Sequence, residues 1–170
     1  SLLKVLVQSS IGEQERIPVY INRVIQNEDN KDFAGQFWPT AKSQKSKVKS
    51  QKSLFIYESH VGMSQEKEGV GTYKEFKENI LPRIKELGYN AIQLMAVAEH
   101  PYYGSFGYHV SNFFAASSRF GTPEELKDLI DTAHDMGIAV IMDLVHSHTV
   151  KNTREGLNLF DGTENQYLVS

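Results

Sequence analysis

The sequence predicts an α/β fold in which parallel strands alternate with helices. Three apolar runs, at 54–57, 91–97 and 138–142, lie between turn residues and have the length of strands rather than of helices. Two amphipathic segments, at 72–87 and 122–136, separate these runs, so the order is strand, helix, strand, helix, strand. Because a helical crossover returns the chain to the same edge of a sheet, we expect the three strands to pair in parallel.

Residues 1–40 are predicted to be the C-terminal end of a small β-domain. The apolar run 2–7 is a plausible strand, and 17–25 is a second β-like stretch in which Pro18 indicates a sheet edge or a strand start. A polar turn follows at 27–32. After it come three large apolar side chains that need a surface to cover them: Phe33, Phe37 and Trp38.

Residues 41–52 are predicted to be a linker. They hold five Lys and no acidic residue, interleaved with Ser and Gln. A basic tract could contact RNA or anionic lipid. Because this one has no aromatic residues and no amphipathic period, we interpret it as a solvated interdomain linker.

Composition narrows the functions open to this chain of 170 residues. Its net charge of −3 provides no broad basic surface, and no apolar run approaches the length of a membrane span, so we predict neither a nucleic-acid nor a membrane partner. The absence of Cys excludes disulfides and thiolate metal ligands and fits a reducing compartment, the cytoplasm. The chain begins with Ser rather than Met, and we expect it to be a piece of a longer polypeptide.

Both predicted helices carry local start and stop signals. Thr72–Glu75 and Thr122–Glu125 have the pattern of capping boxes, and Gly88 and Gly137 are suited to end the helices. Pro82 should kink or divide the first helix because it has no N–H to donate. The apolar residues expected on the buried faces are Phe76, Ile80, Ile84 and Leu87 in the first helix and Leu126, Leu129, Ile130 and Ala133 in the second.

Doubly wound sheets and (β/α)₈ barrels both begin with this order of strands and helices. Two features of the sequence favour the barrel. No Gly-rich phosphate loop follows the first strand, and polar residues follow all three strands. A full barrel needs about 250 residues. Residues 53–170 are therefore predicted to be its N-terminal portion, with about three of the βα units.

The third strand, predicted to be buried on both faces, ends in a cluster of polar side chains. Asp143, His146, Ser147 and His148 follow the apolar run within six positions. One Asp alone would most simply cap the next loop. An Asp with two His favours a functional site, because ligands of parallel α/β folds bind at the carboxyl ends of the strands.

The connection 98–121 between the second strand and the second helix is long, and we expect it to be structureless and functional. It mixes aromatic rings, which stack on the apolar faces of sugars, with polar groups that bond sugar hydroxyls. Tyr108, between Gly107 and His109, is the candidate stacking platform. Phe113 and Phe114 are expected only to pack the loop onto the barrel.

Long motifs give the chain a resemblance to a known family. They are 105–115, Ser-Phe-Gly-Tyr-His-Val-Ser-Asn-Phe-Phe-Ala; 118–123, Ser-Arg-Phe-Gly-Thr-Pro; and 143–148, Asp-Leu-Val-His-Ser-His. These resemble the α-amylase superfamily of glycoside hydrolases, and within it the glycogen and starch branching enzymes. The likeness runs from about 53 to 162, and Arg16-Ile17-Pro18 with Phe37-Trp38 resembles the end of that family's β-sandwich glucan-binding module.

The resemblance implies a retaining transglycosylation on an α-glucan such as glycogen, amylose or amylopectin, without a cofactor. It implies that Tyr108 stacks on a glucose unit, that His148 hydrogen-bonds that unit, and that Asp143 belongs to the site's electrostatic network. His146 and Ser147 are implied neighbours on the same rim. The family's nucleophile and acid lie on later strands, so no catalytic residue is assigned, and the isolated chain is predicted to be inactive. A plant source would imply a plastid instead of the cytoplasm.

Two other interpretations remain open at this point. A metal-dependent barrel hydrolase could use His146 and His148 beside Asp143 to bind Zn²⁺, since alternate residues of an extended strand point the same way. The aromatic loop would have no role in such an enzyme, and we assign no metal ligands. The chain could also be a non-catalytic fragment that binds glucan or a partner.

Overall fold

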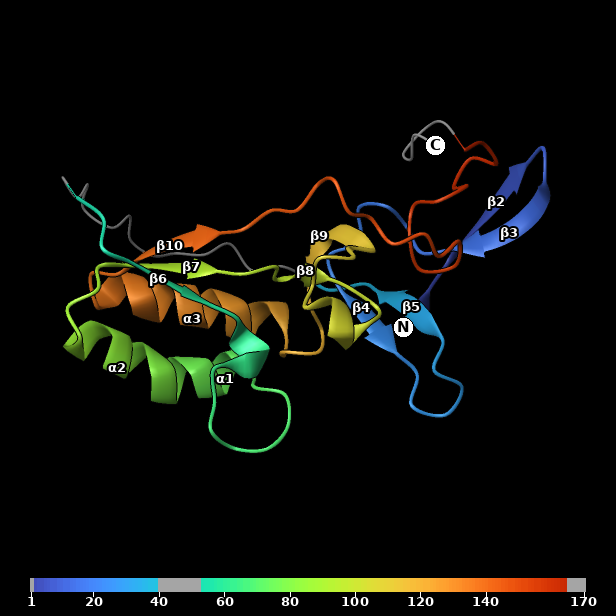
Figure 1. The fold of residues 1–170 in the computed structure, drawn as a ribbon. Helices are drawn as coiled ribbons and strands as arrows, with labels where there is room; N and C mark the ends of the chain where they lie inside the picture. Colours follow the sequence, from blue (N-terminus) through green and yellow to red (C-terminus); the bar gives the residue numbers. More distant parts are fainter. Residues whose placement is uncertain (1, 40–52, 165–170) are drawn as a thin grey trace. The chain divides into compact units, whose positions relative to one another are not determined.

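The computed structural model describes residues 2–39 and 53–164, drawn in Figure 1. The predicted linker, 41–52, lies outside the described residues. The chain forms two compact units, and each is described by itself. Unit 1 contains the described parts of 1–39, 98–118 and 145–170, and unit 2 contains those of 40–97 and 119–144.

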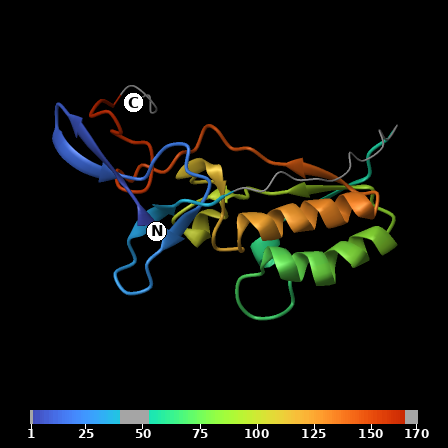
Figure 2. The ribbon, with the colours of Figure 1, turned by 180° about the vertical axis from the view of Figure 1, so that it is seen from behind.

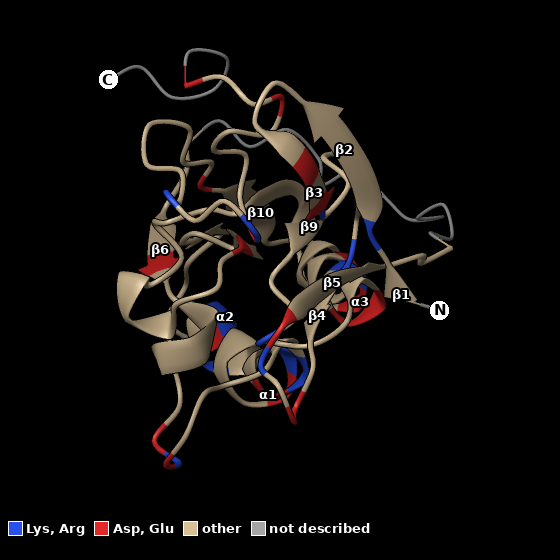
Figure 3. Cartoon of the chain, turned by 90° about the vertical axis from the view of Figure 1, so that its right-hand side faces the viewer, with Lys and Arg blue, Asp and Glu red and all other residues tan. Residues whose placement is uncertain are grey.

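Unit 1 begins with five short strands. They are β1 (Leu2–Leu3), β2 (Val5–Ser9), β3 (Gly12–Arg16), β4 (Val24–Gln26) and β5 (Phe33–Gln36). β2 and β3 form an antiparallel hairpin, and β1, β5 and β4 form a second antiparallel sheet in that order. Figure 3 shows the hairpin, with acidic residues on β3. The predicted strand 2–7 is thus interrupted at Lys4 and continues into the hairpin.

The β-like stretch predicted at 17–25 is only partly correct. Its strand is β4, whereas Ile17 and Ile21 lie outside any strand, and a turn separates them. Both side chains are nevertheless buried, in a small core with Val24 and Ala115. Their apolar character therefore reflects burial rather than strand pairing, a distinction that composition does not make.

The connection predicted to be structureless contains regular structure, so that prediction is wrong. β8 (Ala98–Glu99) pairs with β9 (Asn112–Ala116) in an antiparallel two-stranded sheet, and a 3₁₀ turn occupies Tyr103–Ser105. Backbone pairing between the two ends of the connection satisfies groups that an open loop would leave to water. β9 also supplies Ala115 to the core of unit 1.

Unit 2 contains the predicted parallel sheet. β6 (Ile56–Ser59), β7 (Ala91–Leu94) and β10 (Ala139–Met142) lie in the order β10-β7-β6, with parallel pairing on both sides of β7. A short 3₁₀ turn, Val61–Met63, follows β6. Figures 1 and 2 show the helices along one face of this sheet. The strand–helix–strand–helix–strand order and the parallel pairing are confirmed.

Burial within this sheet differs from the prediction. β7 is buried, but β10 is only half-buried and its Met142 is 41% exposed, so the prediction of burial on both faces is wrong. The physical reason is position, because β10 is an edge strand of the described sheet and helices cover one face. The first strand also begins two residues later than predicted, and Leu54 and Phe55 are exposed.

Pro82 divides the first helix, as predicted. The segment consists of α1 (Tyr73–Glu75), a π-helical turn (Phe76–Ile80) and α2 (Leu81–Glu86). The Leu81 N–H donates to the Phe76 carbonyl five residues back. This turn inserts one residue into the helical repeat, next to a proline that offers no N–H.

The inserted residue changes which side chains face the core. Phe76 and Ile84 are buried as predicted, but Leu81 is buried where Ile80 was expected. Leu87 is 68% exposed, so its predicted burial is wrong. In α3 (Pro123–Asp135) the helix is regular, and the predicted face is confirmed at Leu126, Leu129 and Ala133, with Ile130 half-buried.

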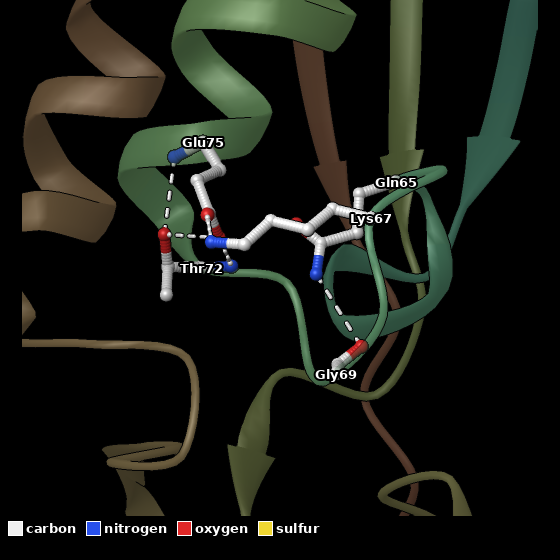
Figure 4. Close-up of polar contacts among 5 residues, drawn as sticks. All are labelled: Gln65, Lys67, Gly69, Thr72 and Glu75. Atoms are coloured by element: carbon white, nitrogen blue, oxygen red, sulfur yellow. Dashed lines mark hydrogen bonds and ion pairs between the residues drawn. The ribbon is translucent and has the colours of Figure 1, made fainter.

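Both capping boxes are confirmed. The Glu75 N–H donates to Thr72 Oγ1 and the Thr72 N–H donates to Glu75 Oε2, each over 3.1 Å (Figure 4). The box at Thr122 and Glu125 has the same two bonds, of 2.7 and 3.2 Å. Both boxes follow from local rules for helix starts, which depend only on residues within one turn.

Both helices also end as predicted. Gly88 and Gly137 have φ angles of +87° and +73°, a region in which glycine has no steric penalty. The N–H groups of the next residues, Tyr89 and Ile138, donate to Ile84 and Ala133 carbonyls, which completes a Schellman motif at each end. Among the described residues, no helix is long and apolar enough to cross a membrane.

Candidate functional site

Tyr108 stands in a tight turn of unit 1. The Phe106 N–H donates to the Tyr103 carbonyl over 2.8 Å, and the Tyr108 N–H donates to the Ser105 carbonyl over 3.0 Å. Phe106 and Gly107 both have left-handed φ angles, +54° and +88°, which reverse the chain immediately before Tyr108. Gly107 suits its position because such an angle is costly for other residues. The Tyr108 side chain is half-buried.

A backbone bridge joins the Tyr108 turn to the segment that carries His148. The Val110 N–H donates to the His148 carbonyl over 3.2 Å, and the Val110 carbonyl accepts from the Val150 N–H over 2.9 Å. Val110 and Thr149 thereby form an isolated parallel β-bridge. A third hydrogen bond between the two segments runs from Thr149 Oγ1 to the Val110 carbonyl. Figure 1 shows the segment after β10 passing the loop of β8 and β9. The structure therefore brings together the neighbourhoods of Tyr108 and His148.

The three residues His146, Ser147 and His148 are exposed, and all three have side-chain contacts. Ser147 Oγ lies 2.8 Å from His148 Nδ1, at hydrogen-bond distance. The His146 ring stacks on Phe113, with centroids 6.1 Å apart and planes within 7°. Phe113 thus contacts the candidate site itself. We call Tyr108 with His146–His148 the Tyr108–His148 site.

Asp143 belongs to unit 2, directly after β10. Its N–H donates to the Leu94 carbonyl over 3.1 Å, which continues the β7–β10 ladder by one residue. Its side chain is half-buried. Its role beside Tyr108 and His148 stays a prediction.

The geometric argument for a metal pair at His146 and His148 does not hold. It assumed an extended strand, but β10 ends at Met142 and both His residues lie outside any strand. Phe113 contacts one of them and Ser147 the other. In the part of the chain that the structure describes, no group of three or more His, Asp or Glu side chains is placed to hold a metal ion.

Phe114 does not follow its expected role. It was predicted to pack the loop onto the barrel, but its side chain is 58% exposed. Its ring lies 4.9 Å from that of Tyr20, centroid to centroid, within unit 1. Neighbouring residues of a strand point to opposite faces, which separates the surroundings of Phe114 from those of Phe113.

Glu99 and His100 are the polar residues that follow the second predicted strand, and in the structure they brace the loop. Both are buried. Glu99 Oε2 accepts the Ser118 N–H over 2.8 Å, and its carbonyl accepts the Ser111 N–H over 2.9 Å. His100 Nδ1 lies 2.9 Å from the Ala98 carbonyl. These bonds close the base of the loop that carries Tyr108.

Arg16 is a second bracing residue that the sequence analysis missed. It is 1% exposed and donates to three carbonyls, those of Gly156, Asn158 and Leu159, over 2.8 to 2.9 Å. Its guanidinium also lies 4.9 Å from the centre of the Phe160 ring. Burial lowers the pKa of Arg16 from its ordinary value. No sequence pattern signals partners about 140 residues away along the chain.

Comparison with known proteins places this arrangement in a family. Residues 55–166 match the family model described as alpha amylase, catalytic domain. Because that match covers more than half of the chain, the chain belongs to the α-amylase family.

The curated relatives are more specific. The chain is 53% identical to a 1,4-alpha-glucan-branching enzyme of Dictyostelium discoideum, over 100% of this chain and 26% of that protein. It is 55% identical to one of Aspergillus oryzae, over 98% of this chain and 25% of that protein. A 1,4-alpha-glucan-branching enzyme 2-2, chloroplastic/amyloplastic, of Arabidopsis thaliana is 50% identical, over 100% and 22%. The chain therefore spans about a quarter of the length of these relatives.

Among solved structures, a trehalose-6-phosphate hydrolase of Bacillus licheniformis is similar. The sequence identity is 31% and the TM-score is 0.56, over 67% of this chain and 20% of that one. This similarity supports the α/β character of the described chain.

Proposed function

We propose that this chain is part of a glucan branching enzyme, which cleaves an α-1,4-glucan and transfers the segment to form an α-1,6 branch. The observation that carries the proposal is the backbone bridge between Val110 and His148–Val150, which joins the Tyr108 turn to the His146–His148 segment. The similarity to 1,4-alpha-glucan-branching enzymes supplies the reaction. Its substrate is an α-glucan polysaccharide: glycogen, amylose or amylopectin.

Each residue of the Tyr108–His148 site has a distinct role in binding one glucose unit. The Tyr108 ring stacks on the apolar face of the sugar, and the turn at Phe106 and Gly107 fixes the ring's position. His148 bonds a sugar hydroxyl through Nε2, because Ser147 occupies its Nδ1. His146 lies two residues from His148, and its ring stacks on Phe113. For Asp143 we propose a part in the site's electrostatic network on the family resemblance alone.

The covalent steps need two carboxylates that we assign to neither unit. In a retaining mechanism one carboxylate attacks the anomeric carbon while an acid protonates the leaving glycosidic oxygen. A hydroxyl of an acceptor glucan then displaces the enzyme carboxylate, and its proton passes to the residue that served as acid. We propose that these 170 residues bind the glucan, and that they do not transfer it when isolated. The greater length of the relatives supports this division.

We propose the following organisation for the chain. Residues 1–40 are the end of a β-sandwich glucan-binding module, 41–52 a linker, and 53–170 the N-terminal portion of a (β/α)₈ catalytic barrel. The parallel sheet of β6, β7 and β10 supports the last of these. The compartment is the cytoplasm, or a plastid if the source is a plant, as the name of the Arabidopsis thaliana relative indicates for that protein.

A chimera tests the proposal. Residues 1–170 replace the matching segment of the Dictyostelium discoideum relative, and α-1,6 linkages formed on amylose are counted by proton NMR and by debranching. We expect the chimera to form branches, and the isolated chain to be retained on amylose without forming any. Tyr108→Ala should abolish most branching, whereas Tyr102→Ala, which alters an exposed ring in the same loop, should not.

The proposal fails if the Tyr108→Ala chimera branches amylose as fast as the unchanged chimera. It also fails if the purified 170-residue chain contains stoichiometric zinc, because the metal-dependent alternative would then replace it.

A further inference from the structure

Residues 151–164 follow the Tyr108–His148 site directly and belong to no helix or strand. Because such a segment has no backbone ladder, its conformation depends on the other groups that bond its backbone. Leu159 has a left-handed φ angle of +51°, which a residue other than glycine keeps only where its surroundings enforce it. The contacts that fix this segment therefore bear on the position of the site just before it.

Arg16, the last residue of β3, makes such contacts. Its guanidinium donates to the Gly156 and Asn158 carbonyls over 2.8 Å each and to the Leu159 carbonyl over 2.9 Å. Gln14 Oε1, in the same strand, accepts a fourth bond over 3.3 Å. Figures 1 and 2 show this last described part of the chain, in red, beside the β2–β3 hairpin. The planar fork of donors on arginine suits several acceptors at once, and a lysine ammonium does not reproduce it.

The surroundings of Arg16 couple its position to that of the segment. The side chain is 1% exposed, and its acceptors among the described residues are carbonyl and amide oxygens rather than carboxylates. The Phe160 ring covers the guanidinium, with 4.9 Å between its centre and the arginine Cζ. A buried cation without acceptors is costly. Any displacement of the segment would impose that cost, so the Arg16 contacts favour one conformation.

Two residues that Arg16 bonds lead back toward the site. Asn158 Nδ2 donates to the Lys151 carbonyl over 2.8 Å. Gly156 packs closely on Val150: a Cβ at position 156 would lie 2.7 Å from Val150 Cγ1, closer than carbon atoms approach without a clash. The segment held by Arg16 is therefore in direct contact with residues 150 and 151.

Val150 is in turn part of the bridge to the Tyr108 turn. Its N–H donates to the Val110 carbonyl over 2.9 Å, and the Val110 N–H donates to the His148 carbonyl over 3.2 Å. Contacts thus run without a gap from Arg16, through the irregular segment, to the backbone of His148. All of them lie within unit 1.

We propose that Arg16 is a positioning residue of the Tyr108–His148 site. By fixing residues 150–160 it keeps the bridge at Val110 closed and the His148 ring in place to bond the sugar. Arg16 acts through His148 and not on the glucan itself. The inference rests on the proposed function for the reaction that His148 serves. It makes β3, in the N-terminal part of the chain, necessary for full activity.

A double-mutant cycle in the branching chimera tests this role. Arg16→Lys keeps the positive charge and loses the fork of donors. It should slow branch formation on amylose about tenfold, because a small displacement of His148 misplaces the bound glucose. In the His148→Ala chimera the same change should cost less than about twofold, since the group that Arg16 positions is already absent. A purely structural defect would lower the rate by the same factor in both backgrounds.

Amide hydrogen exchange in the 170-residue chain tests the path without glucan. Arg16→Lys should speed exchange of the Val110 and Val150 N–H groups about tenfold, because both donate in the bridge, and should leave β7 of unit 2 unchanged. Asn158→Ala removes the bond to Lys151 and keeps the carbonyl that Arg16 bonds. It should speed the same two amides by a smaller factor, which keeps the path testable if Arg16→Lys destabilises the whole chain.

The matched control for exchange is Arg23→Lys, also in unit 1. Arg23 likewise combines a ring contact with a bond to a glutamine: its guanidinium lies 4.7 Å from the centre of the Trp38 ring, and Nε donates to Gln36 Oε1 over 3.1 Å. These partners precede the site in the chain instead of following it. The control should leave exchange at Val110 and Val150 unchanged.

Either of two results would overturn the inference: an equal loss from Arg16→Lys in both chimeras, or unchanged exchange at Val110 and Val150 in both Arg16→Lys and Asn158→Ala. The proposed function is judged separately. If the chimera branches amylose but the cycle is additive, the branching proposal stands and the positioning role falls. If the chimera forms no branches while exchange rises as expected, the proposed function falls and the role of Arg16 in closing the bridge stands.

Discussion

Two polar clusters of unit 1 follow the same sequence pattern and have opposite surroundings. Glu99 and His100 come after the apolar residues of the second strand and are 1% and 0% exposed. His146–His148 come after the apolar residues of the third strand and are exposed. Polar residues beyond a strand can therefore brace a loop or stay accessible to a ligand, and burial distinguishes the two cases.

The difference has a physical origin in the backbone. Glu99 belongs to β8, where pairing with β9 surrounds its side chain and supplies the Ser118 N–H to its carboxylate. Among the described residues, His146–His148 pair with no strand, and the bridge at Val110 and Thr149 holds only the end of the segment. A buried carboxylate needs such donors, whereas an exposed imidazole is free to bind from solvent.

The largest expected effect is on the exposed cluster. In the branching chimera, His148→Ala should lower the rate of branch formation about 100-fold, because one directed hydrogen bond to the substrate is lost. The midpoint of urea unfolding of the 170-residue chain should not change. His109→Ala is the matched control, since it removes an exposed imidazole from the neighbouring turn. A comparable fall in the control would break the comparison.

Substitutions in the buried cluster should lower the free energy of unfolding. Glu99→Ala leaves the Ser118 and His100 N–H groups without their carboxylate acceptor and should lower the free energy of unfolding by about 1–3 kcal/mol, measured by urea denaturation. Glu99→Gln retains one acceptor oxygen and should cost less. Unchanged stability with lost glucan binding would instead assign Glu99 to the site.

A smaller effect is expected at Ser147, which bonds His148 but does not touch the sugar in our proposal. Ser147→Ala should raise the Kd for maltoheptaose about fivefold, measured by calorimetry, because His148 loses a bond worth about 1 kcal/mol that orients its ring. Ser147→Thr keeps the hydroxyl and should restore most of the affinity. Equal weakening by both changes would indicate that the hydroxyl has no orienting role.

The smallest effect, on the pH dependence of stability, is expected at Glu75 in the capping box of unit 2. The hydrogen bond from the Thr72 hydroxyl lowers the pKa of Glu75 below its ordinary value of 4.5. A lowered folded-state pKa stabilises the fold above pH 4.5, and this contribution is lost as the pH falls through the folded pKa. The melting temperatures of the wild type and Glu75→Gln should therefore differ at pH 7 and converge under more acidic conditions. A constant difference across that range would contradict this assignment.

The sequence by itself determined the features that depend on a few neighbouring residues. Both capping boxes, the glycine stops at Gly88 and Gly137 and the division of the helix at Pro82 follow from local hydrogen bonding and sterics. The alternation of strands and helices was also predicted, because apolar period and length are visible along the chain. The family motifs predicted Tyr108 and His148 as sugar-binding residues, whereas the residues alone indicated only a polar, aromatic rim.

Only the tertiary structure decided which of these groups are buried and which meet. The bridge between Val110 and Thr149 and the Arg16 contacts with Gly156–Leu159 join segments that lie far apart in sequence. The pairing of β8 with β9 is marked by no short sequence pattern. The inserted π turn changed the buried face at Leu81 and Leu87, because one extra residue rotates everything after it. Burial and long-range bonds depend on the whole packed chain, and a local sequence pattern contains neither.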